Sequence, residues 1–281
     1  QYCTPIQAQV LTHTLAGADA IGRAQTGTGK TAAFLITIIN DLLRNPITVP
    51  RYAGEPRALI VAPTRELAMQ IEKDANLLAH HTDLQVMSVV GGMNFNRQQE
   101  RLQSHMIDIL VATPGRLLDF GKRRDLWLDR VESLVLDEAD RMLDMGFVDS
   151  ISEIIEQTPT RRQTLLFSAT YPAGIKELAG RFLRDPAEIK VAAQDDQPRI
   201  EQRFYEVAPE QRLEAVTRLL YSLRPTSCVA FCFTKQQCQE VADHLTAKGV
   251  SAMALNGDLD QRDRDQVLGM FANRSLSVLV A

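Results

Sequence analysis

Residues 24–31 read AQTGTGKT, a glycine-rich stretch that ends in Lys30-Thr31. Spaced glycines before GKT are typical of a loop whose backbone N–H groups converge on phosphate oxygens, although Ala24 replaces the usual first glycine. In such a loop Lys30 reaches the β- and γ-phosphates, and the Thr31 hydroxyl ligates Mg²⁺. Residues 32–40 have a helical pattern, and the dipole of a helix there would strengthen an anion site. The alternative is a Gly/Thr turn that ends in Lys-Thr by chance.

A second polar segment begins where the apolar run at residues 133–136 (SLVL) ends, with the sequence DEAD at residues 137–140. Acids after a buried strand lie at the functional edge of a parallel sheet, where Asp137 holds Mg²⁺ through its hydration shell. Glu138 is then placed to orient or deprotonate an attacking water. Taken alone, the segment is equally typical of a helix N-terminus, which favours acids. Together the two segments predict hydrolysis of an ATP-type triphosphate, with Lys30, Asp137 and Glu138 as the catalytic residues.

Short apolar runs alternate with amphipathic stretches along the chain, which predicts an α/β fold with parallel sheets. In such sheets ligands bind at the carboxyl ends of the strands. Strands are expected at residues 58–62, 107–112, 133–136 and 164–167, with helices at 66–79 and 150–157. Residues 44–56 are rich in proline and predict a surface loop. The alternation restarts after a polar segment, with strand candidates at 203–207, 228–233, 251–255 and 277–281.

The 281 residues suggest about two domains at ~150 residues each. We expect a first domain at residues 1–190, a linker at 191–201 and a second domain at 202–281. Because the last apolar run would leave a buried strand without its covering helix, the chain is interpreted as a fragment whose second domain is incomplete.

Charge and composition exclude several classes of protein. The net charge is 31 − 35 = −4, so nucleic acid would be bound by a local surface and not by bulk positive charge. There is no apolar run of ~18 residues to span a membrane, and no secretory leader is visible. The four cysteines contain no CxxC pair, so neither a zinc site nor a disulfide framework is indicated, and reduced thiols in a cytoplasmic protein are expected.

The order of motifs resembles the DEAD-box ATP-dependent RNA helicases. Besides residues 24–31 and 137–140, the matching segments are TPIQ at 4–7, PTRELA at 63–68, GG at 91–92, TPGR at 113–116, SAT at 168–170, FCFT at 231–234 and NGDLDQRDR at 256–264. The resemblance implies two RecA-like domains of the P-loop NTPase type. It also implies an RNA-stimulated ATPase that holds ATP–Mg²⁺ and single-stranded RNA between those domains and locally unwinds short duplexes. RNA bound through phosphate and sugar would be bound largely independently of its sequence.

The resemblance also implies residue roles. Gln7 is similar to the family glutamine that reads the adenine edge, and the ATP-binding set is Thr4, Gln7, Ala24, Gln25, Thr26, Gly27, Thr28, Gly29, Lys30 and Thr31. Thr31 and Asp137 are the implied Mg²⁺ ligands. The residues that couple nucleotide to RNA are Asp140, Ser168 and Thr170, through hydrogen bonds toward the acidic segment. The implied RNA contacts are Pro63, Thr64, Arg65, Gly91, Gly92, Thr113, Gly115 and Arg116, and in the second domain Thr234, Gly257, Gln261 and Arg264.

Each role has a simpler alternative. Gln7 alone would be a surface glutamine, Ser168 and Thr170 would form an ordinary turn after a strand, and Thr64 would cap a helix. Arg262 and Arg264 would belong to a salt-bridged, solvated helix. Phe233 and Asn256 depart from the family, which usually has asparagine and histidine there.

The family's γ-phosphate arginines are expected downstream of Ala281, so these residues alone are expected to bind ATP weakly and to hydrolyse it poorly. A DNA helicase or translocase, a non-catalytic RNA-binding clamp and a small-molecule kinase are the alternative functions. The first half is most similar to bacterial helicases of RNA turnover, and the part after about Arg162 to a helicase of ribosome assembly. Proteins of those two processes are the implied partners.

Overall fold

A computed structural model describes residues 2–25, 27–191 and 200–281. The chain divides into two compact units, Gln1–Gln197 and Pro198–Ala281. Both units are α/β, with parallel strands, as the alternation of apolar and amphipathic stretches predicts. Most of the expected linker at 191–201 falls on residues 192–199, which lie outside the described residues.

The first unit contains a sheet whose described strands follow the order β3-β4-β2-β5-β6-β1-β7. All of its strand pairs are parallel; for example, Ala20 of β1 lies opposite Leu165 of β6 and Ala187 of β7. The strands are β1 (Ala20–Arg23), β2 (Ala58–Val61), β3 (Val86–Val89), β4 (Ile109–Ala112), β5 (Ser133–Leu136), β6 (Gln163–Ser168) and β7 (Ala187–Lys190). Central strands such as β2, β4 and β5 are buried throughout because both faces of the sheet are covered.

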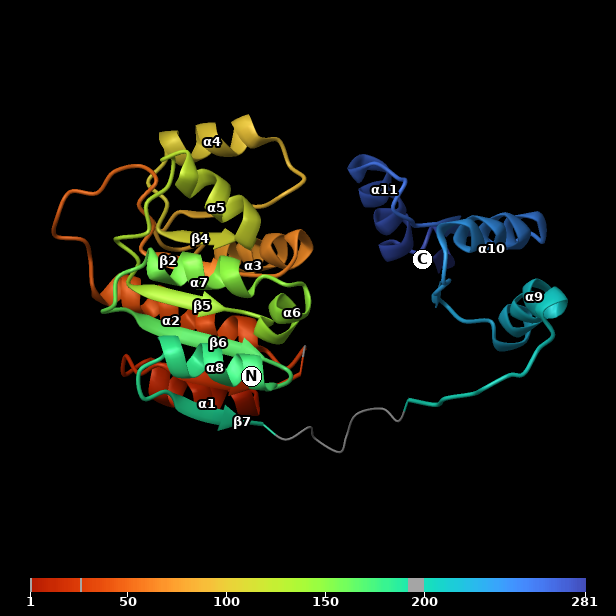
Figure 1. Cartoon of the computed structure of the whole chain (residues 1–281), viewed down its shortest axis with the longest axis horizontal. Coiled ribbons are helices and arrows are strands. Elements are labelled where there is room, and N and C mark those ends of the chain that lie inside the picture. The colour runs from red at the N-terminus through yellow and green to blue at the C-terminus, as the bar shows by residue number, and fades with distance from the viewer. Residues whose placement is uncertain (1, 26, 192–199) are drawn as a thin grey trace. The chain divides into compact units, whose positions relative to one another are not determined.

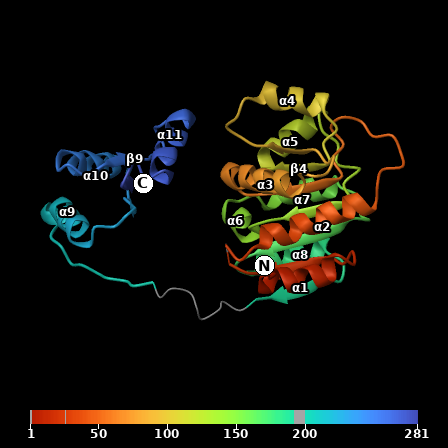
Figure 2. The same cartoon turned by 180° about the vertical axis from the view of Figure 1, so that it is seen from behind.

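Helices cover the two faces of this sheet in two layers (Figures 1 and 2). Helices α1 (Pro5–Thr14), α2 (Lys30–Arg44) and α3 (Arg65–Leu78) form the layer in front in Figure 2. The other layer, in front in Figure 1, contains α5 (Pro114–Lys122), α6 (Ala139–Asp144), α7 (Val148–Glu156) and α8 (Ala173–Phe182). Helix α4 (Phe95–Ser104) lies at the end of the unit near β4. Each layer packs its own apolar cluster onto the sheet.

A glycine in β1 leaves room for an aromatic ring of β6. Gly22 lies opposite Phe167 in the register of these strands, and a Cβ on Gly22 would lie 2.5 Å from the Phe167 ring. That ring in turn packs against Phe34 of α2, with the ring centroids 5.4 Å apart. Helix α2, which begins at the phosphate loop, therefore packs against strand β6, which ends at Ser168 of the SAT segment.

The second unit has a smaller sheet of described strands in the order β8-β10-β9, all parallel. Its elements are η1 (Pro209–Gln211), α9 (Arg212–Leu223), β8 (Cys228–Ala230), α10 (Lys235–Ala247), β9 (Ala252–Ala254), α11 (Gln261–Ala272) and β10 (Val278–Val280). Residues such as Leu245 and Val280 form a compact core.

The expected strand at residues 203–207 is wrong. Residues 201–208 form no helix or strand, and Phe204 is 91% exposed. The alternating pattern fails because none of the described strands pairs with this segment, and an unpaired strand cannot satisfy its backbone groups. The proline-rich loop is confirmed, because residues 45–57 contain no helix or strand.

Among the described residues, every helix falls short of the length and apolar character that a membrane span requires.

Candidate functional site

The carboxyl edge of the first sheet divides the predicted site residues into two groups. The adjacent strands β5, β6 and β1 end at the acidic segment, the SAT segment and the phosphate loop. The adjacent strands β3, β4 and β2 end at the GG, TPGR and PTRELA segments. Because the strands are parallel, each group gathers at one half of a single edge. The sheet order therefore separates the expected nucleotide residues from the expected RNA residues.

The two segments that carry the predicted chemistry line one cavity. It has a volume of about 380 Å³, and its lining includes Lys30 and Thr31 from α2 and Asp137 and Glu138 from the end of β5. These pairs are more than a hundred positions apart in the sequence, and parallel pairing through β6 brings their strands close. The structure therefore brings these four residues together at one cavity.

The phosphate loop has the backbone that its glycines allow. Gly27 and Gly29 have φ angles of 80° and 90°, a left-handed conformation that other residues adopt only with strain. The Thr28 hydroxyl donates to the Gln25 carbonyl at 2.8 Å, and the Lys30 ammonium donates to the Ala24 carbonyl at 2.7 Å. Lys30 is only 6% exposed at the start of α2. Thr26 lies outside the described residues.

Asp137 is a buried acid, 3% exposed, beneath this loop. Burial raises its pKa to about 6, and the neighbouring positive charge of Lys30 offsets that rise only in part. Its Oδ1 accepts the backbone N–H of Glu138 at 2.9 Å, which also favours the charged form. The raised pKa means that the carboxylate has too little positive charge around it.

Glu138 is held in strained backbone geometry beside Asp137. Its φ and ψ are 50° and 49°, the left-handed region, as it begins helix α6. Such a conformation costs a non-glycine residue about 1–3 kcal/mol and is common where a side chain is held for function. The side chain is half-buried and pairs with Arg141, 3.3 Å away. The acid-rich helix start that the sequence left as an alternative exists, but its carboxylates also line the cavity.

The cavity fits Mg²⁺ by the chemistry of its donors. The Thr31 hydroxyl and the carboxylates of Asp137 and Glu138 are oxygen ligands, the kind that Mg²⁺ prefers. Mg²⁺ is usually held by one or two carboxylates together with substrate phosphates, so this small donor set suffices. A divalent cation would also supply the positive charge that buried Asp137 lacks.

Asp140 is joined to the SAT segment by hydrogen bonds, as the resemblance implies. The Thr170 hydroxyl and backbone N–H both donate to Asp140 Oδ2 at 2.8 Å, and the Asp140 N–H donates to the Ser168 hydroxyl at 3.2 Å. Burial raises the pKa of Asp140, but the hydrogen bonds from Thr170 and Ser168 outweigh it and lower the pKa below its usual value. The carboxylate is therefore kept charged in this pairing.

Thr4 and Gln7 form a capping box at the start of α1. Thr4 accepts from the Gln7 N–H, and Gln7 Oε1 accepts from the Thr4 N–H at 3.0 Å. Gln7 Nε2 also donates to the Gly29 carbonyl at 3.2 Å. Gln7 is thus attached to the phosphate loop and is no isolated surface residue. Its amide retains a second hydrogen and a second lone pair, which is what reading an adenine edge requires.

The expected RNA residues of the first unit lie on three neighbouring loops. The Thr113 hydroxyl accepts the Gly91 N–H at 3.3 Å, and both terminal nitrogens of Arg116 donate to the Met93 carbonyl at 3.3 Å. Gly91, Gly92 and Gly115 are exposed, Thr64, Arg65, Thr113 and Arg116 are half-buried, and Pro63 is buried. The capping alternative for Thr64 is present, since it accepts the Leu67 N–H at 3.3 Å.

The expected RNA residues of the second unit lie after β8 and β9. Thr234 caps α10 and is exposed, as is Gly257. Gln261 donates to Asp265 at 3.0 Å. Arg264 donates to the Leu259 carbonyl at 3.2 Å and to the Asn256 carbonyl at 3.4 Å, so it holds the preceding loop.

Four cavity residues were not predicted from the sequence. Ala32 of α2 and Leu67, Gln70 and Asp74 of α3 also line the nucleotide cavity. The three residues of α3 recur at helical spacing from Leu67 of the PTRELA segment onward, and that spacing was the available signal. Because α3 packs beside α2, one face of α3 reaches the cavity, which no local pattern in the sequence reveals.

The chain is similar to known proteins over most of its length. Residues 4–178 match the family described as DEAD/DEAH box helicase, and residues 211–281 match the helicase conserved C-terminal domain. The chain is 50% identical to the ATP-dependent RNA helicase RhlB of Pseudomonas aeruginosa, covering 100% of this chain and 71% of that protein. It is 46% identical to the ATP-dependent RNA helicase DbpA of Escherichia coli, covering 99% and 59%.

A solved structure is also similar. The RNA helicase Prp28 from Chaetomium thermophilum, bound to ADP, matches with a TM-score of 0.60 and 34% identity, over 99% of this chain and 66% of that chain.

Proposed function

The chain belongs to the DEAD/DEAH box helicases and is an ATP-dependent RNA helicase by family, and from this we propose that it binds ATP–Mg²⁺ at the phosphate loop and uses hydrolysis to open short RNA duplexes. The main support is the single cavity that Lys30, Thr31, Asp137 and Glu138 share. A turn that ended in Lys-Thr by chance would have no reason to face two carboxylates from another strand.

In the proposed reaction, Lys30 leaves the Ala24 carbonyl and donates to the β- and γ-phosphates. Glu138 orients a water and accepts its proton as the water oxygen bonds to the γ-phosphorus and the bond to the β–γ bridging oxygen breaks. Thr31 and Asp137 would hold Mg²⁺, which when bound supplies positive charge to the phosphate oxygens. The buried setting of Asp137 supports this role, because a cation in the cavity restores its ordinary charged state.

For RNA, we propose contacts from the loops after β2, β3 and β4 to phosphate and sugar. Exposed glycines allow close approach of a backbone, and Arg65 and Arg116 supply positive charge at this edge. Binding through phosphates should be insensitive to sequence and weakened by salt. Contacts to the ribose 2′-OH would favour RNA over DNA. The second unit enters this proposal through Thr234, Gly257, Gln261 and Arg264, on the sequence resemblance.

The hydrogen-bonded group of Asp140, Ser168 and Thr170 is proposed to couple the two ligands. It lies between the acidic segment and the end of β6, so a shift of the acids on nucleotide binding would move the SAT segment. The resemblance also supports slow ATP turnover by residues 1–281 alone. It further supports a cytoplasmic location and partner proteins from RNA turnover or ribosome assembly.

The test measures RNA-stimulated release of phosphate from ATP for the wild type and for Glu138→Gln. Glu138→Gln should retain ATP binding and lose roughly 10²–10⁴ in hydrolysis rate, the usual contribution of a general base. Glu153→Gln, an exposed acid on α7, is the matched control and should behave as the wild type. Unchanged hydrolysis in Glu138→Gln would favour a non-catalytic clamp. Equal competition by DNA of the same sequence would favour a DNA translocase.

A further inference from the structure

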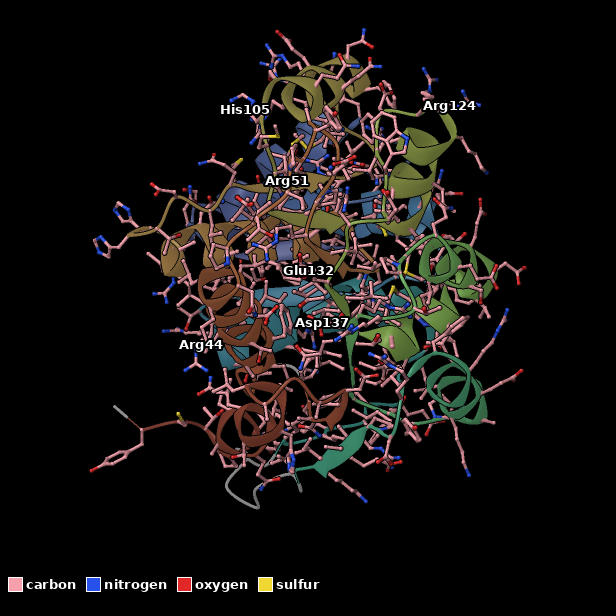
Figure 3. All side chains as sticks on the ribbon, turned by 90° about the vertical axis from the view of Figure 1, so that its left-hand side faces the viewer. Arg44, Arg51, His105, Arg124, Glu132 and Asp137 are labelled. Atoms are coloured by element: carbon pink, nitrogen blue, oxygen red, sulfur yellow. The ribbon has the colours of Figure 1, made fainter. Side chains whose placement is uncertain are left out.

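A second cavity lies at the opposite edge of the first sheet. It has a volume of about 600 Å³, larger than the nucleotide cavity, and its lining combines the loop after α2 with charged residues that precede strands. Arg57 precedes β2, Glu132 precedes β5, Arg162 precedes β6 and Arg184 lies shortly before β7. These strands are consecutive in the sheet apart from β1, so the cavity runs along the amino edge. Figure 3 looks onto this edge, with Glu132 near the middle and Arg44 below it on the left.

One wall of this cavity is the proline-rich loop, which is anchored at both ends. Arg57 donates to both carboxylate oxygens of Glu132, at 3.1 and 2.7 Å, and to the Asn45 carbonyl at 2.5 Å. Arg51 donates to Asp108 at 2.7 Å and to the Ile107 carbonyl at 2.9 Å. These bonds hold the loop segment that contributes Ile47 and Val49 to the cavity. The loop that forms this wall is therefore held in place by hydrogen bonds to the rest of the first unit.

The arginines of the other wall exceed the acids available to them. Arg57 and Glu132 neutralise each other, which leaves Arg161, Arg162 and Arg184 against one remaining lining acid, Asp41, whose Oδ1 accepts the Asn45 amide at 2.8 Å. Among the described residues Arg161 is exposed and has no hydrogen-bond or ion-pair partner. Arg184 uses one terminal nitrogen on the Arg162 carbonyl, and Arg162 donates to the Pro159 carbonyl at 2.7 Å. The structure gives the remaining guanidinium N–H groups no acceptor within residues 2–25, 27–191 and 200–281.

Arg162 is the most buried arginine of this wall. It is 8% exposed, and its Nε–H has no hydrogen-bond acceptor among the described residues. A buried donor without an acceptor costs about 1–3 kcal/mol. Burial lowers the pKa of Arg162, nearby Asp19 opposes that change, and Arg184 adds to it. Each carboxylate oxygen of Asp19 already accepts a backbone N–H, from Thr164 at 2.8 Å and from Arg184 at 2.7 Å.

We propose that this amino-edge cavity binds a small phosphate-bearing ligand, independently of the nucleotide cavity. Arginine presents N–H donors in a planar fork that matches phosphate oxygens, and three arginines line this one cavity. A compact dianion fits that arrangement better than an extended polymer, which needs donors along a line. The volume lies within the ~300–1,000 Å³ range of small-molecule sites. Ile47 and Val49 offer an apolar surface to any organic part of the ligand.

The probe is inorganic pyrophosphate, titrated calorimetrically into the full chain. We expect two molecules bound per chain in the wild type, because the phosphate loop takes one and the amino-edge cavity takes the other. Lys30→Ala should remove the first only. Arg161→Glu and Arg184→Gln should each weaken the second at least tenfold and leave the first unchanged. Arg130→Glu, an exposed arginine near the same edge but outside the cavity, should retain both.

The experiment distinguishes a failure of the amino-edge proposal from a failure of the nucleotide-site proposal. A single pyrophosphate per wild-type chain that Lys30→Ala abolishes would overturn the amino-edge proposal and leave the nucleotide site intact. Two molecules bound with unchanged affinity in both Arg161→Glu and Arg184→Gln would also overturn it. Tighter binding of a glutamate-rich peptide than of pyrophosphate, lost in Arg161→Glu, would assign the cavity to an acidic protein segment instead. Far-ultraviolet circular dichroism and the fluorescence of Trp127 show that each variant is folded.

Discussion

Replacing Asp137 by Asn should stabilise the ligand-free protein while it damages the nucleotide site. Asp137 is buried, and burial raises its pKa from 3.8 to about 6 although Lys30 lies near. Asn has nearly the same shape, and its Oδ1 can still accept the Glu138 N–H. The substitution therefore removes a poorly compensated charge without opening a cavity.

The magnitude and its pH dependence follow from the pKa. Between pH 3.8 and about 6 the folded protein holds a proton on Asp137 that the unfolded chain has released. Stability therefore falls as the pH rises through this window, by about 1.4 kcal/mol per unit, or about 3 kcal/mol in all. At pH 8 Asp137→Asn should gain up to about 3 kcal/mol in the free energy of unfolding. Near pH 4 the gain should vanish, because Asp137 is then protonated in the wild type.

Urea unfolding followed by tryptophan fluorescence measures this directly. Trp127 is the one tryptophan of the sequence and belongs to the first unit, so its signal reports the unit that contains Asp137. Asp140→Asn is the matched control with the opposite sign. Hydrogen bonds from Thr170 hold the pKa of Asp140 low, so that substitution should destabilise the protein at neutral pH. An Asp137→Asn variant that is less stable than the wild type at pH 8, or whose effect does not change with pH, would refute the reasoning.

Three further predictions concern the phosphate loop, the loop anchor and the coupling group. Gly29→Ala should weaken ATP binding at least tenfold and destabilise the fold by about 1 kcal/mol. The reason is that φ is 90° at this position and a Cβ would meet the Gln7 amide. Titration calorimetry measures the loss of binding, and urea unfolding measures the loss of stability. Arg57→Ala should lower the free energy of unfolding by about 2–4 kcal/mol, because it removes a buried guanidinium that binds one carboxylate and two carbonyls. Urea unfolding followed by tryptophan fluorescence measures this change. A change of less than about 0.5 kcal/mol, the usual effect of a surface substitution, would contradict the prediction. Thr170→Val removes one hydrogen bond to Asp140. The rate of duplex unwinding should fall several-fold more than the rate of ATP hydrolysis measured without RNA. An equal fall in both rates would argue against a coupling role.

Four of the described strands of the first sheet could be predicted from the sequence. The runs at 58–62, 107–112, 133–136 and 164–167 correspond to β2, β4, β5 and β6, because strands covered on both faces are continuously apolar. Strands β1, β3 and β7 were missed: β1 contains Gly22, β3 contains Ser88, and β7 is an edge strand with charged residues. Their strand character comes from pairing with neighbours and not from composition.

For the site, spacing and residue type identified Lys30, Thr31, Asp137 and Glu138, because GKT and an acid-ended strand each have a specific chemical use. The sequence could not show that Asp74 lines the same cavity, since that depends on how α3 packs beside α2. Nor could it show the amino-edge cavity. Its arginines come from three separate segments of the chain, at 57, 161–162 and 184, and the order of strands brings these segments together.

The central claim is that the phosphate loop and the acidic segment act on one metal–nucleotide complex. Calorimetric titration of ATP with Mg²⁺ into the wild type, Lys30→Ala, Asp137→Ala and the double variant tests it most directly. Each single change should weaken binding at least tenfold, and the double variant should lose much less than the product of the two, because both residues serve the same ligand. Binding by Asp137→Ala as tight as by the wild type, or fully additive losses, would contradict a shared site.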